Sequence, residues 1–398
     1  MTIKRVLCVS YGGGHAAMLT PVIKELEKNA NIEVIILGLT TAKSYFSSRG
    51  VESLGFKDFT FLADNTYREI GESLIDGTES SNLVSREESL AYMGINMLEL
   101  IDTYGTEDAH QNFINRGRQA FLPVNFFTKV IKHLDVDLVI ATNSPRSEQA
   151  AILAARNLHV KSICLVDLFA LQEYLWIKDD MYADKVCVLN KEVKRFLISH
   201  DRCDEHIVVT GNPAFDIINR KEKIEGGRAI RSKLNTDKIV IFYASQVEPA
   251  KHPYADLKGD PMLPRDIEAT LRKFVRENEN YQLIVRYHPS ENVTFVKEDR
   301  IEYGGGDLHS ILHAVDIVVV MSSTVGLEAY LAGKPVISID LSVFSPDAPY
   351  SEMGISRGVK SLDTLKDAIY DTRMSNESDR KQTDALDKVI QEINSLLF

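Results

Sequence analysis

Several residue classes and motifs are scarce in this chain of 398 residues. It has four cysteines, three of which (Cys8, Cys164 and Cys187) stand in apolar, strand-like runs where a free thiol packs as a small hydrophobe. This excludes a disulfide-stabilised secreted scaffold and predicts reduced, cytoplasmic surroundings. No apolar run approaches the length of a membrane span, and a strand-like segment starts at Arg5, so neither insertion nor export is expected.

Positive charge is in deficit, because 46 Lys and Arg face 57 Asp and Glu, for a net charge of −11. This balance disfavours electrostatic binding of nucleic acid or anionic lipid. The segment from His200 to His206 contains ligand-type residues but matches no tetrahedral spacing, so we read it as a solvated turn and predict no metal. With 44% hydrophobic and 26% charged residues, the composition is that of a globular enzyme.

The dinucleotide fingerprint G-x-G-x-x-G is also missing. Tyr11-Gly12-Gly13-Gly14-His15 follows the first strand, and no acidic residue follows the second, so NAD and FAD are disfavoured and no cofactor is expected. Glycines let the backbone approach a ligand, which makes Gly13 and Gly14 binding candidates. His15 stands at a helix start beside the ligand edge of an α/β sheet, where a general base is expected, although a lone His is more often structural.

Strands and helices alternate along the chain, which predicts parallel sheets wound with helices. We expect an α/β fold of two facing Rossmann-like domains, residues 1–218 and 219–378, with the ligand cleft between them. A helical insertion at about 66–133 breaks the alternation and should shape a pocket. Residues 379–398 should form an amphipathic helix that packs back on the first domain. The predicted strands are Arg5–Ser10, Ile32–Leu37, Leu138–Ala141, Val160–Leu165, Lys185–Leu189, His206–Thr210, Lys238–Phe242, Gln282–Tyr287, Ile317–Met321 and Pro335–Asp340.

The run from Val315 to Asp340 reads as a buried strand, a hydroxyl-rich turn at Ser322-Ser323-Thr324, a helix capped by Thr324, and a second strand. The first turn of such a helix binds anions, so phosphate is expected there. Glu328 lies on the same helical face, and its carboxylate suits the paired hydroxyls of a ribose. Taken alone, this segment is explained equally well without a ligand. A Ser/Thr cap between a strand and a helix is ordinary α/β architecture, and a Glu near the start of a helix complements the helix dipole.

Other residues of the second half end strands at the same edge. Pro289 stops a strand and leaves His288 at its end, with Arg286 on the same face by two-residue alternation. Both side chains could contact phosphate. The structural alternative is that His288 caps the strand end and Arg286 forms a surface ion pair. Ser245 and Gln246 follow the first strand of this half, and three glycines at 304–306 add a further turn with free N–H groups.

With these residues in view, the chain resembles the GT-B superfamily of nucleotide-sugar enzymes. The glycine loop with Pro21 is similar to the acceptor loop of GT-B glycosyltransferases, which implies that His15 deprotonates the acceptor hydroxyl. The run from Ser322 to Ala329 with Gly333-Lys334-Pro335 looks like the donor motif, which implies Glu328 on ribose and Ser323 and Thr324 on phosphate. The segment Thr210–Asp216 resembles the UDP-N-acetylglucosamine 2-epimerase branch, whereas His288-Pro289 with Ser322-Ser323 resembles sialyl-, Kdo- and CDP-glycerol-type transferases, so UDP and CMP donors both stay open.

Departures from the epimerase branch separate the alternatives. The branch has a G-T-R-x-E type start and an acidic residue where this chain has Thr142-Asn143-Ser144, and an amide or hydroxyl cannot abstract a proton from carbon as a carboxylate can. After the following strand, the epimerase branch has a further acidic position, and this chain keeps it as Asp167. Asp167 could orient His15 or bind the acceptor. The structural alternative is that Asp167 caps a helix. We assign Asn143, Ser144 and Asn212 to the acceptor side.

The sequence therefore predicts a metal-independent, inverting glycosyltransferase. It would move a sugar from a pyrimidine-nucleotide donor to a carbohydrate, lipid-linked or other hydroxyl acceptor, with His15 and Asp167 as catalytic residues. A 2-epimerase and a non-catalytic nucleotide-sugar-binding protein are the alternatives. A retaining reaction is the alternative to inversion, because Glu328 would also suit a retaining enzyme. The donor sugar, the acceptor, the stereochemical outcome and the oligomeric state are left open.

Overall fold

The chain divides into two compact units in a computed structural model that describes residues 3–75, 84–234, 237–253, 255–374 and 384–398. Unit 1 comprises Met1–Ala214 and Asp384–Phe398, and unit 2 comprises Phe215–Thr383. The division falls after Ala214, four residues before the expected boundary at 218. Among the described residues, no helix is both long enough and apolar enough to cross a membrane.

Unit 1 is built on a six-stranded sheet in the order β2-β1-β3-β4-β5-β6, in which every pair of neighbours is parallel. All six strands predicted for this half are confirmed to within one residue at each end. The main elements are β1 (Lys4–Ser10), α1 (Gly13–Leu26), β2 (Ile32–Gly38), α2 (Thr41–Ser48), β3 (Leu138–Thr142), α7 (Ser147–Asn157), β4 (Lys161–Leu165), α8 (Tyr174–Ile177), β5 (Lys185–Val188), α9 (Lys191–Ile198) and β6 (Ile207–Val209).

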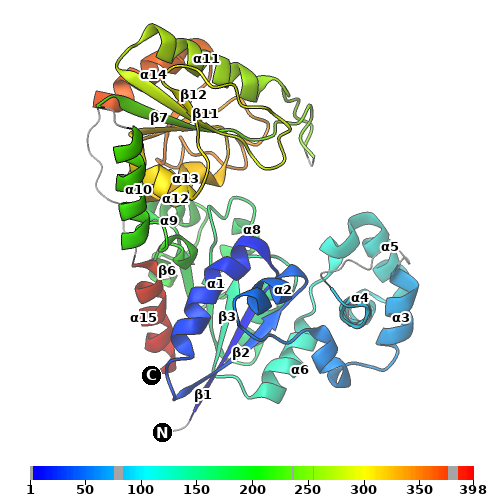
Figure 1. The fold of residues 1–398 in the computed structure, drawn as a ribbon. Coiled ribbons are helices and arrows are strands. Elements are labelled where there is room, and N and C mark those ends of the chain that lie inside the picture. Colours follow the sequence, from blue (N-terminus) through cyan, green and yellow to red (C-terminus); the bar gives the residue numbers. More distant parts are fainter. Residues whose placement is uncertain (1–2, 76–83, 235–236, 254, 375–383) are drawn as a thin grey trace. The chain divides into compact units, whose positions relative to one another are not determined.

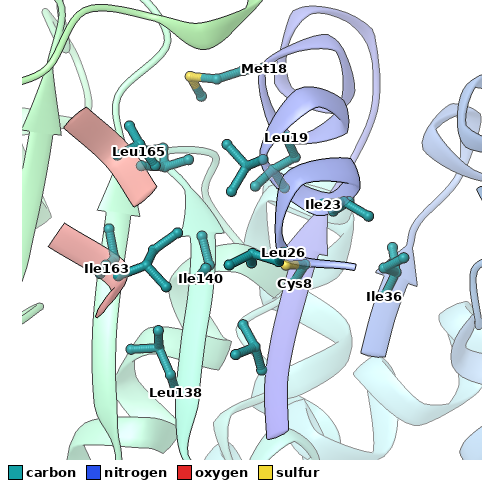
Figure 2. Packing of buried hydrophobic residues seen from close by; sticks show 14 of the residues in the cluster. Cys8, Met18, Leu19, Ile23, Leu26, Ile36, Leu138, Ile140, Ile163 and Leu165 are labelled. Carbon is teal, nitrogen blue, oxygen red and sulfur yellow. The ribbon is translucent and has the colours of Figure 1, made fainter. Parts of the chain in front are cut away.

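Helix α1 covers one face of this sheet. Leu19, Ile23 and Leu26 recur at helical spacing and point toward the strands, where they meet Cys8 of β1 and Ile140 of β3 (Figure 2). Burying each such aliphatic side chain contributes roughly 2 kcal/mol. Burial also raises the pKa of the Cys8 thiol to about 12, so this cysteine acts as a core hydrophobe.

The predicted insertion is helical. It begins with a 3-10 helix at Phe56–Leu62, continues through α3 (Tyr67–Leu74), α4 (Arg86–Tyr104) and α5 (Thr106–Arg116), and ends in α6 (Val124–Leu134), which leads into β3. Helices α3, α4 and α5 group to one side of the unit 1 sheet (Figure 1). Most of its aromatic residues form its core, as in the stack of Phe56 on Phe126 with ring centroids 4.9 Å apart.

The C-terminal helix α15 (Ala385–Leu397) returns to unit 1, as predicted, and lies beside α1 (Figure 1). Its residues Val389, Ile393 and Leu397 join the same apolar core as α1. The first residues of the predicted helix, 379–383, lie outside the described part of the chain.

Unit 2 repeats the plan with a second parallel sheet in the order β12-β11-β10-β7-β8-β9. The four strands predicted for this half, β7, β8, β10 and β11, are confirmed, whereas the three-residue edge strands β9 and β12 were not predicted. The elements are α10 (Lys221–Leu234), β7 (Ile239–Ala244), α11 (Leu263–Glu277), β8 (Tyr281–Arg286), β9 (Ile301–Tyr303), α12 (Leu308–Ala314), β10 (Ile317–Val320), α13 (Thr324–Leu331), β11 (Val336–Ile339), β12 (Arg357–Val359) and α14 (Leu365–Met374).

Helix α10 contains two adjacent glycines, Gly226 and Gly227. A Cβ added at Gly226 would lie 2.4 Å from the Ser310 Oγ, and one at Gly227 would lie 2.4 Å from the Cβ of His313, both on α12. The glycine pair therefore serves close contact between two helices and not a flexible linker.

Candidate functional site

Each sheet has one topological switch point, where successive connections leave in opposite directions and where α/β sheets bind ligands. In unit 1 this point lies between β1 and β3, because the chain runs from β1 to β2 on one side and reaches β3 to β6 on the other. In unit 2 it lies between β7 and β10. The residues predicted for function follow the carboxyl ends of strands at these edges.

His15 stands in the first turn of α1, directly after the glycine loop. Its Nε2 lies 3.7 Å from the Asp167 Oδ2, and the two side chains are only 22% and 24% exposed. The loop requires glycine: Gly12 and Gly13 have φ of 148° and 56°, and a Cβ at Gly12 would lie 2.1 Å from the Thr41 Oγ1. A Cβ at Gly13 or Gly14 would meet nothing within 4 Å, so both positions border open space.

Asp167 is held by the two asparagines that we assigned to the acceptor side. The Asp167 N–H donates to the Asn143 Oδ1 at 3.0 Å, and the Asn212 Nδ2 donates to the Asp167 carbonyl at 2.9 Å. The Asp167 Oδ1 accepts the Leu168 N–H at 2.8 Å, which leaves Oδ2 to face His15. Ser144 is buried beside Asn143. Both asparagines thus place the carboxylate, and any contact with an acceptor stays a prediction.

Glu173 is a second carboxylate near His15, and the sequence analysis did not identify it. Burial and the charge of Asp167 raise the pKa of Glu173, and the charge of His15 opposes them. The sequence offers no pattern that links Glu173 to His15, since Glu173 only precedes the short helix α8.

Glu148 is a third carboxylate of unit 1, and it was also missed. It is fully buried in the first turn of α7, and no side chain among the described residues donates a hydrogen bond to its carboxylate. Burial raises its pKa to about 7, although the backbone N–H groups of Glu148 and Tyr11 and the charge of Arg146 act in the opposite direction. Arg146 itself has φ of 71° and lies over the Tyr11 ring, 4.7 Å from its centroid. In sequence, Glu148 looks like an ordinary acidic residue at a helix start.

The insertion borders this site through Tyr92 of α4. Burial raises the pKa of Tyr92, and the charges of Arg146 and Glu148 both act on it. Within the insertion lies a cavity of about 430 Å³ that includes Glu99 and Asp64 in its wall. Glu99 already accepts the N–H groups of Asn125 and Phe126 at 2.6 and 3.0 Å, so its role is to cap α6.

In unit 2, the loops after β7 and β10 are bound to each other. The Gln246 Nε2 donates to the Ser322 Oγ at 2.8 Å, and the Ser322 N–H donates to the Gln246 Oε1 at 3.1 Å. Helix α13 then begins at Thr324, but its N-cap is Ser323, whose Oγ accepts the Val325 N–H at 3.3 Å. The prediction of Thr324 as N-cap was wrong by one residue, because Ser323 keeps extended backbone angles and Thr324 is already helical.

Glu328 lies one turn into α13 and is 15% exposed. Its Oε2 lies 2.9 Å from the Nε2 of His309, in the first turn of α12. The His309 side chain was missed by the sequence analysis because the pairing joins two separate helices. The arrangement leaves a carboxylate with one remaining oxygen beside the N-terminus of α13.

Arg286 and His288 both stand at the end of β8, but they do different things. The Arg286 Nη1 donates to the carbonyls of Gly306 at 2.9 Å and Gly304 at 3.4 Å, so Arg286 braces the glycine loop before α12. The His288 Nδ1 accepts the Ser290 N–H at 3.1 Å. When neutral, His288 therefore carries its proton on Nε2, where it can donate to a ligand.

Ser245 takes part in a buried network that holds the His288 turn. The Ser245 Oγ donates to the Glu291 Oε1 at 2.8 Å, and Arg265 Nη2 lies 2.8 Å from the same oxygen. The other carboxylate oxygen of Glu291 accepts the His288 N–H at 2.7 Å. Ser245 was predicted to bind donor, and in this structure its hydroxyl is occupied by protein groups.

No protein-family model matches the chain, and no curated protein sequence matches it. Solved structures do. The UDP-GlcNAc 2-epimerase of Methanocaldococcus jannaschii matches with a TM-score of 0.57 at 14% identity, over 98% of this chain and 99% of that chain. The Neisseria meningitidis UDP-GlcNAc 2-epimerase, solved with UDP-GlcNAc, matches with a TM-score of 0.55 at 13% identity, over 98% and 100%. The glycosyltransferase of kitacinnamycin matches with a TM-score of 0.52 at 11% identity, over 100% and 96%.

This chain has the GT-B fold. The two-domain α/β architecture expected from the sequence is confirmed. At such low identities the likeness extends to the fold, and epimerases and a glycosyltransferase both share it.

Among the described residues outside these edges, one group of ligand-type side chains comes together. Asp180, Cys203 and His206 each bring a ligand atom to within 4.8 Å of the others. The Asp180 Oδ1, however, accepts the Cys203 N–H at 2.6 Å and lies 3.8 Å from the Nε of Arg202. Because a cation already faces this carboxylate, we assign no metal to the group.

Proposed function

We propose that this GT-B chain is a glycosyltransferase in which His15 deprotonates an acceptor hydroxyl. The observation that carries the proposal is the pairing of His15 with Asp167 at the ligand edge of unit 1, on a loop whose backbone only glycine adopts readily. A histidine that lies beside a held carboxylate is stabilised as a cation when it takes up a proton. This arrangement suits an O–H substrate.

The transfer has one displacement step. The acceptor oxygen forms a bond to the anomeric carbon as His15 takes its proton, and the nucleotide departs with the electrons of its bond to that carbon. Such a displacement inverts the anomeric centre. Charge on the departing phosphate is assigned to the first turn of α13 at Ser323 and Thr324 and to the Nε2 proton of His288, without a metal.

The donor is proposed to be a pyrimidine-nucleotide sugar, UDP- or CMP-linked, held by unit 2. Glu328 supports this assignment, because His309 bonds only one oxygen of this half-buried carboxylate and the other oxygen can accept a ligand hydroxyl. The ribose diol supplies hydroxyls at the required distance from a phosphate. Arg286 contributes by bracing the glycine loop before α12, which we propose faces the base.

The test removes the base and keeps the nucleotide. His15→Ala should lower sugar transfer by a factor of about 10²–10⁴, while thermal shifts with UDP and CMP stay at wild-type size, because the nucleotide site is in unit 2. His110→Ala, the same change on exposed helix α5, is the matched control. Undiminished transfer by His15→Ala would remove this residue from the reaction.

A second candidate is a nucleotide-sugar 2-epimerase. It is favoured by Glu173, which together with Asp167 gives two carboxylates near His15, as a reaction that removes and returns a proton on carbon requires. The structural likeness to UDP-GlcNAc 2-epimerases points the same way. Incubation with UDP-GlcNAc alone in heavy water decides: an epimer or free sugar with deuterium at C2 supports epimerisation. Nucleotide binding without turnover in either assay would favour a non-catalytic binding protein.

A further inference from the structure

A second cavity of unit 1, of about 400 Å³, lies outside the residues described above. Its apolar wall consists of Leu153 of α7, Leu175 and Trp176 of α8, and Tyr182. Four hydrogen-bonding side chains complete the lining: Gln149, Lys178, Asp179 and Asp201. A concave site of this size with an aromatic wall and a few polar groups is typical of small-molecule binding.

The aromatic wall presents carbon to the cavity. Trp176 is half-buried and its indole Nε1 is fully buried, so the surface that it exposes is hydrocarbon. Tyr182 is 1% exposed with a buried hydroxyl, and it forms the floor. The C–H face of a sugar ring packs on such a surface, while its hydroxyls reach outward to polar neighbours.

The polar lining selects among ligands of this size. Lys178, Asp179 and Asp201 all line the cavity, and Asp179 is already paired with Arg156 at 2.9 Å. Because Lys178 balances the remaining carboxylate of Asp201, the lining has no excess of positive charge to hold a phosphate or a carboxylate ligand. The Gln149 amide and the Asp201 carboxylate are groups that bond neutral hydroxyls, so the chemistry fits an uncharged carbohydrate.

The cavity is preformed. Arg202 is fully buried and donates to the carbonyls of Ile177 at 3.0 Å, Ala183 at 2.8 Å and also Asp179, which fixes both ends of the segment that carries Lys178 and Tyr182. A site fixed in advance loses less conformational entropy when it binds.

The position of the cavity connects it to the proposed chemistry. Gln149 lies in the first turn of α7, which follows β3, so it stands at the carboxyl edge of the sheet where His15 lies. Trp176 is three residues after Glu173, whose pKa responds to the charges of His15 and Asp167. A ligand that occupies the cavity therefore lies along the same edge as the proposed base.

We propose that this cavity, lined by Trp176, Tyr182, Gln149 and Asp201, is a carbohydrate subsite for the acceptor. The assignment to the acceptor rests on the proposed glycosyltransferase function, whereas carbohydrate binding by the cavity does not. The inference narrows the acceptor from any hydroxyl compound to a sugar or a glycan.

Trp176 is the chain's one tryptophan, which makes intrinsic fluorescence a direct report on this cavity. The full chain is titrated with N-acetylglucosamine, glucose, galactose and their short β-linked oligomers; ligands of this size typically bind in the millimolar range. We expect a saturable change in intensity or wavelength with at least one carbohydrate. Glycerol and inorganic phosphate should give none.

Two variants keep the tryptophan and change the polar lining. Gln149→Ala and Asp201→Asn should weaken the response at least fivefold; Asn tolerates the φ of 73° at position 201. Gln111→Ala on exposed helix α5 should match the wild type. Folding of each variant is checked by circular dichroism.

The outcomes are separable from those for His15. No saturable response to any carbohydrate, or a response that both lining variants retain in full, overturns the subsite whatever the activity assays show. A response to glycerol as strong as that to sugars would also overturn it, because the cavity would then lack selectivity. Conversely, a saturable titration that the lining variants weaken supports the carbohydrate subsite whether His15→Ala is active or inactive in the transfer assay.

Discussion

The two switch points differ in whether their polar groups have hydrogen-bond partners. In unit 1, buried polar atoms at the ends of β1 and β3 have no hydrogen-bond partner among the described residues; they belong to Ser10, Thr142, Asn143 and Arg146. In unit 2, the corresponding loops are bound to each other through Gln246 and Ser322, and Ser245 is bound to Glu291. The edge of unit 1 thus has polar groups without hydrogen-bond partners, whereas the polar groups at the edge of unit 2 are bonded to one another.

The difference is energetic. A buried polar group without a partner costs about 1–3 kcal/mol, so the unit 1 edge lowers the stability of its own fold. Folds accept such costs where reactive groups must be held ready, whereas a bonded edge is already arranged for binding. The comparison supports our proposal that unit 1 performs the chemistry and unit 2 binds the nucleotide.

The sharpest way to break this division is to change the carboxylate that faces His15. Asp167→Asn keeps the shape of the side chain and the backbone bonds to Asn143 and Asn212, but it removes the charge that would stabilise protonated His15. We expect kcat to fall by a factor of about 10² or more, with UDP affinity unchanged by calorimetry. A comparable loss of UDP affinity would contradict the separation of roles.

The next largest effect is expected at Glu148 and concerns stability. Its folded pKa is raised from 4.5 to about 7, so the folded state favours the protonated form. Both states are protonated well below pH 4.5. The folded state loses stability as the pH rises from about 4.5 to about 7, because the unfolded state releases its proton first; the loss is on the order of 3 kcal/mol and is complete above pH 7. Glu148→Gln removes the charge, so the variant should be more stable than the wild type at pH 8, and the gap should close toward pH 4.5.

Thermal melts of both proteins from pH 4.5 to 8.5 measure this gap. Glu52→Gln, the same change at an exposed position, controls for the loss of one surface charge. Parallel curves for Glu148→Gln and the wild type across this range would show that the carboxylate is not strained by burial, and the contrast between the two edges would weaken.

Local patterns predicted the frame of both units but not the state of their side chains. Apolar runs that alternate with helical segments predicted every strand of unit 1. The glycine loop predicted that His15 lies at the ligand edge of the sheet. The short strands β9 and β12 were not predicted, because three residues are too few to show a hydrophobic periodicity.

The missing site residues share one cause. The burial of Glu148, the proximity of Glu173 to His15 and the pairing of His309 with Glu328 all depend on contacts between distant segments. No local spacing encodes such contacts. The predicted roles of Arg286 and Ser245 were incomplete for the same reason, since both side chains bond protein groups that only the fold brings near.

A smaller effect is expected from Glu328→Gln, which sharpens the assignment of unit 2. Losing a hydrogen bond to a charged group typically costs about 1.5–3 kcal/mol, so UDP and CMP affinity should fall at least tenfold. Binding of inorganic pyrophosphate, which has no ribose, should stay the same. Equal weakening for pyrophosphate would mean that Glu328 acts on the anion site or on the fold, and Glu302→Gln at an exposed position is the control.

The smallest effect tests which hydroxyl caps α13. Ser323→Ala removes the acceptor for the Val325 N–H and should cost about 1 kcal/mol in the local opening free energy of the first turn. Thr324→Ala should cost little, because Thr324 is already helical and alanine is the better helix former. Hydrogen exchange of the α13 amides distinguishes the two. If both variants also bind phosphate more weakly, Ser323 and Thr324 serve the ligand as well as the helix; faster exchange in Thr324→Ala alone would return the cap to Thr324.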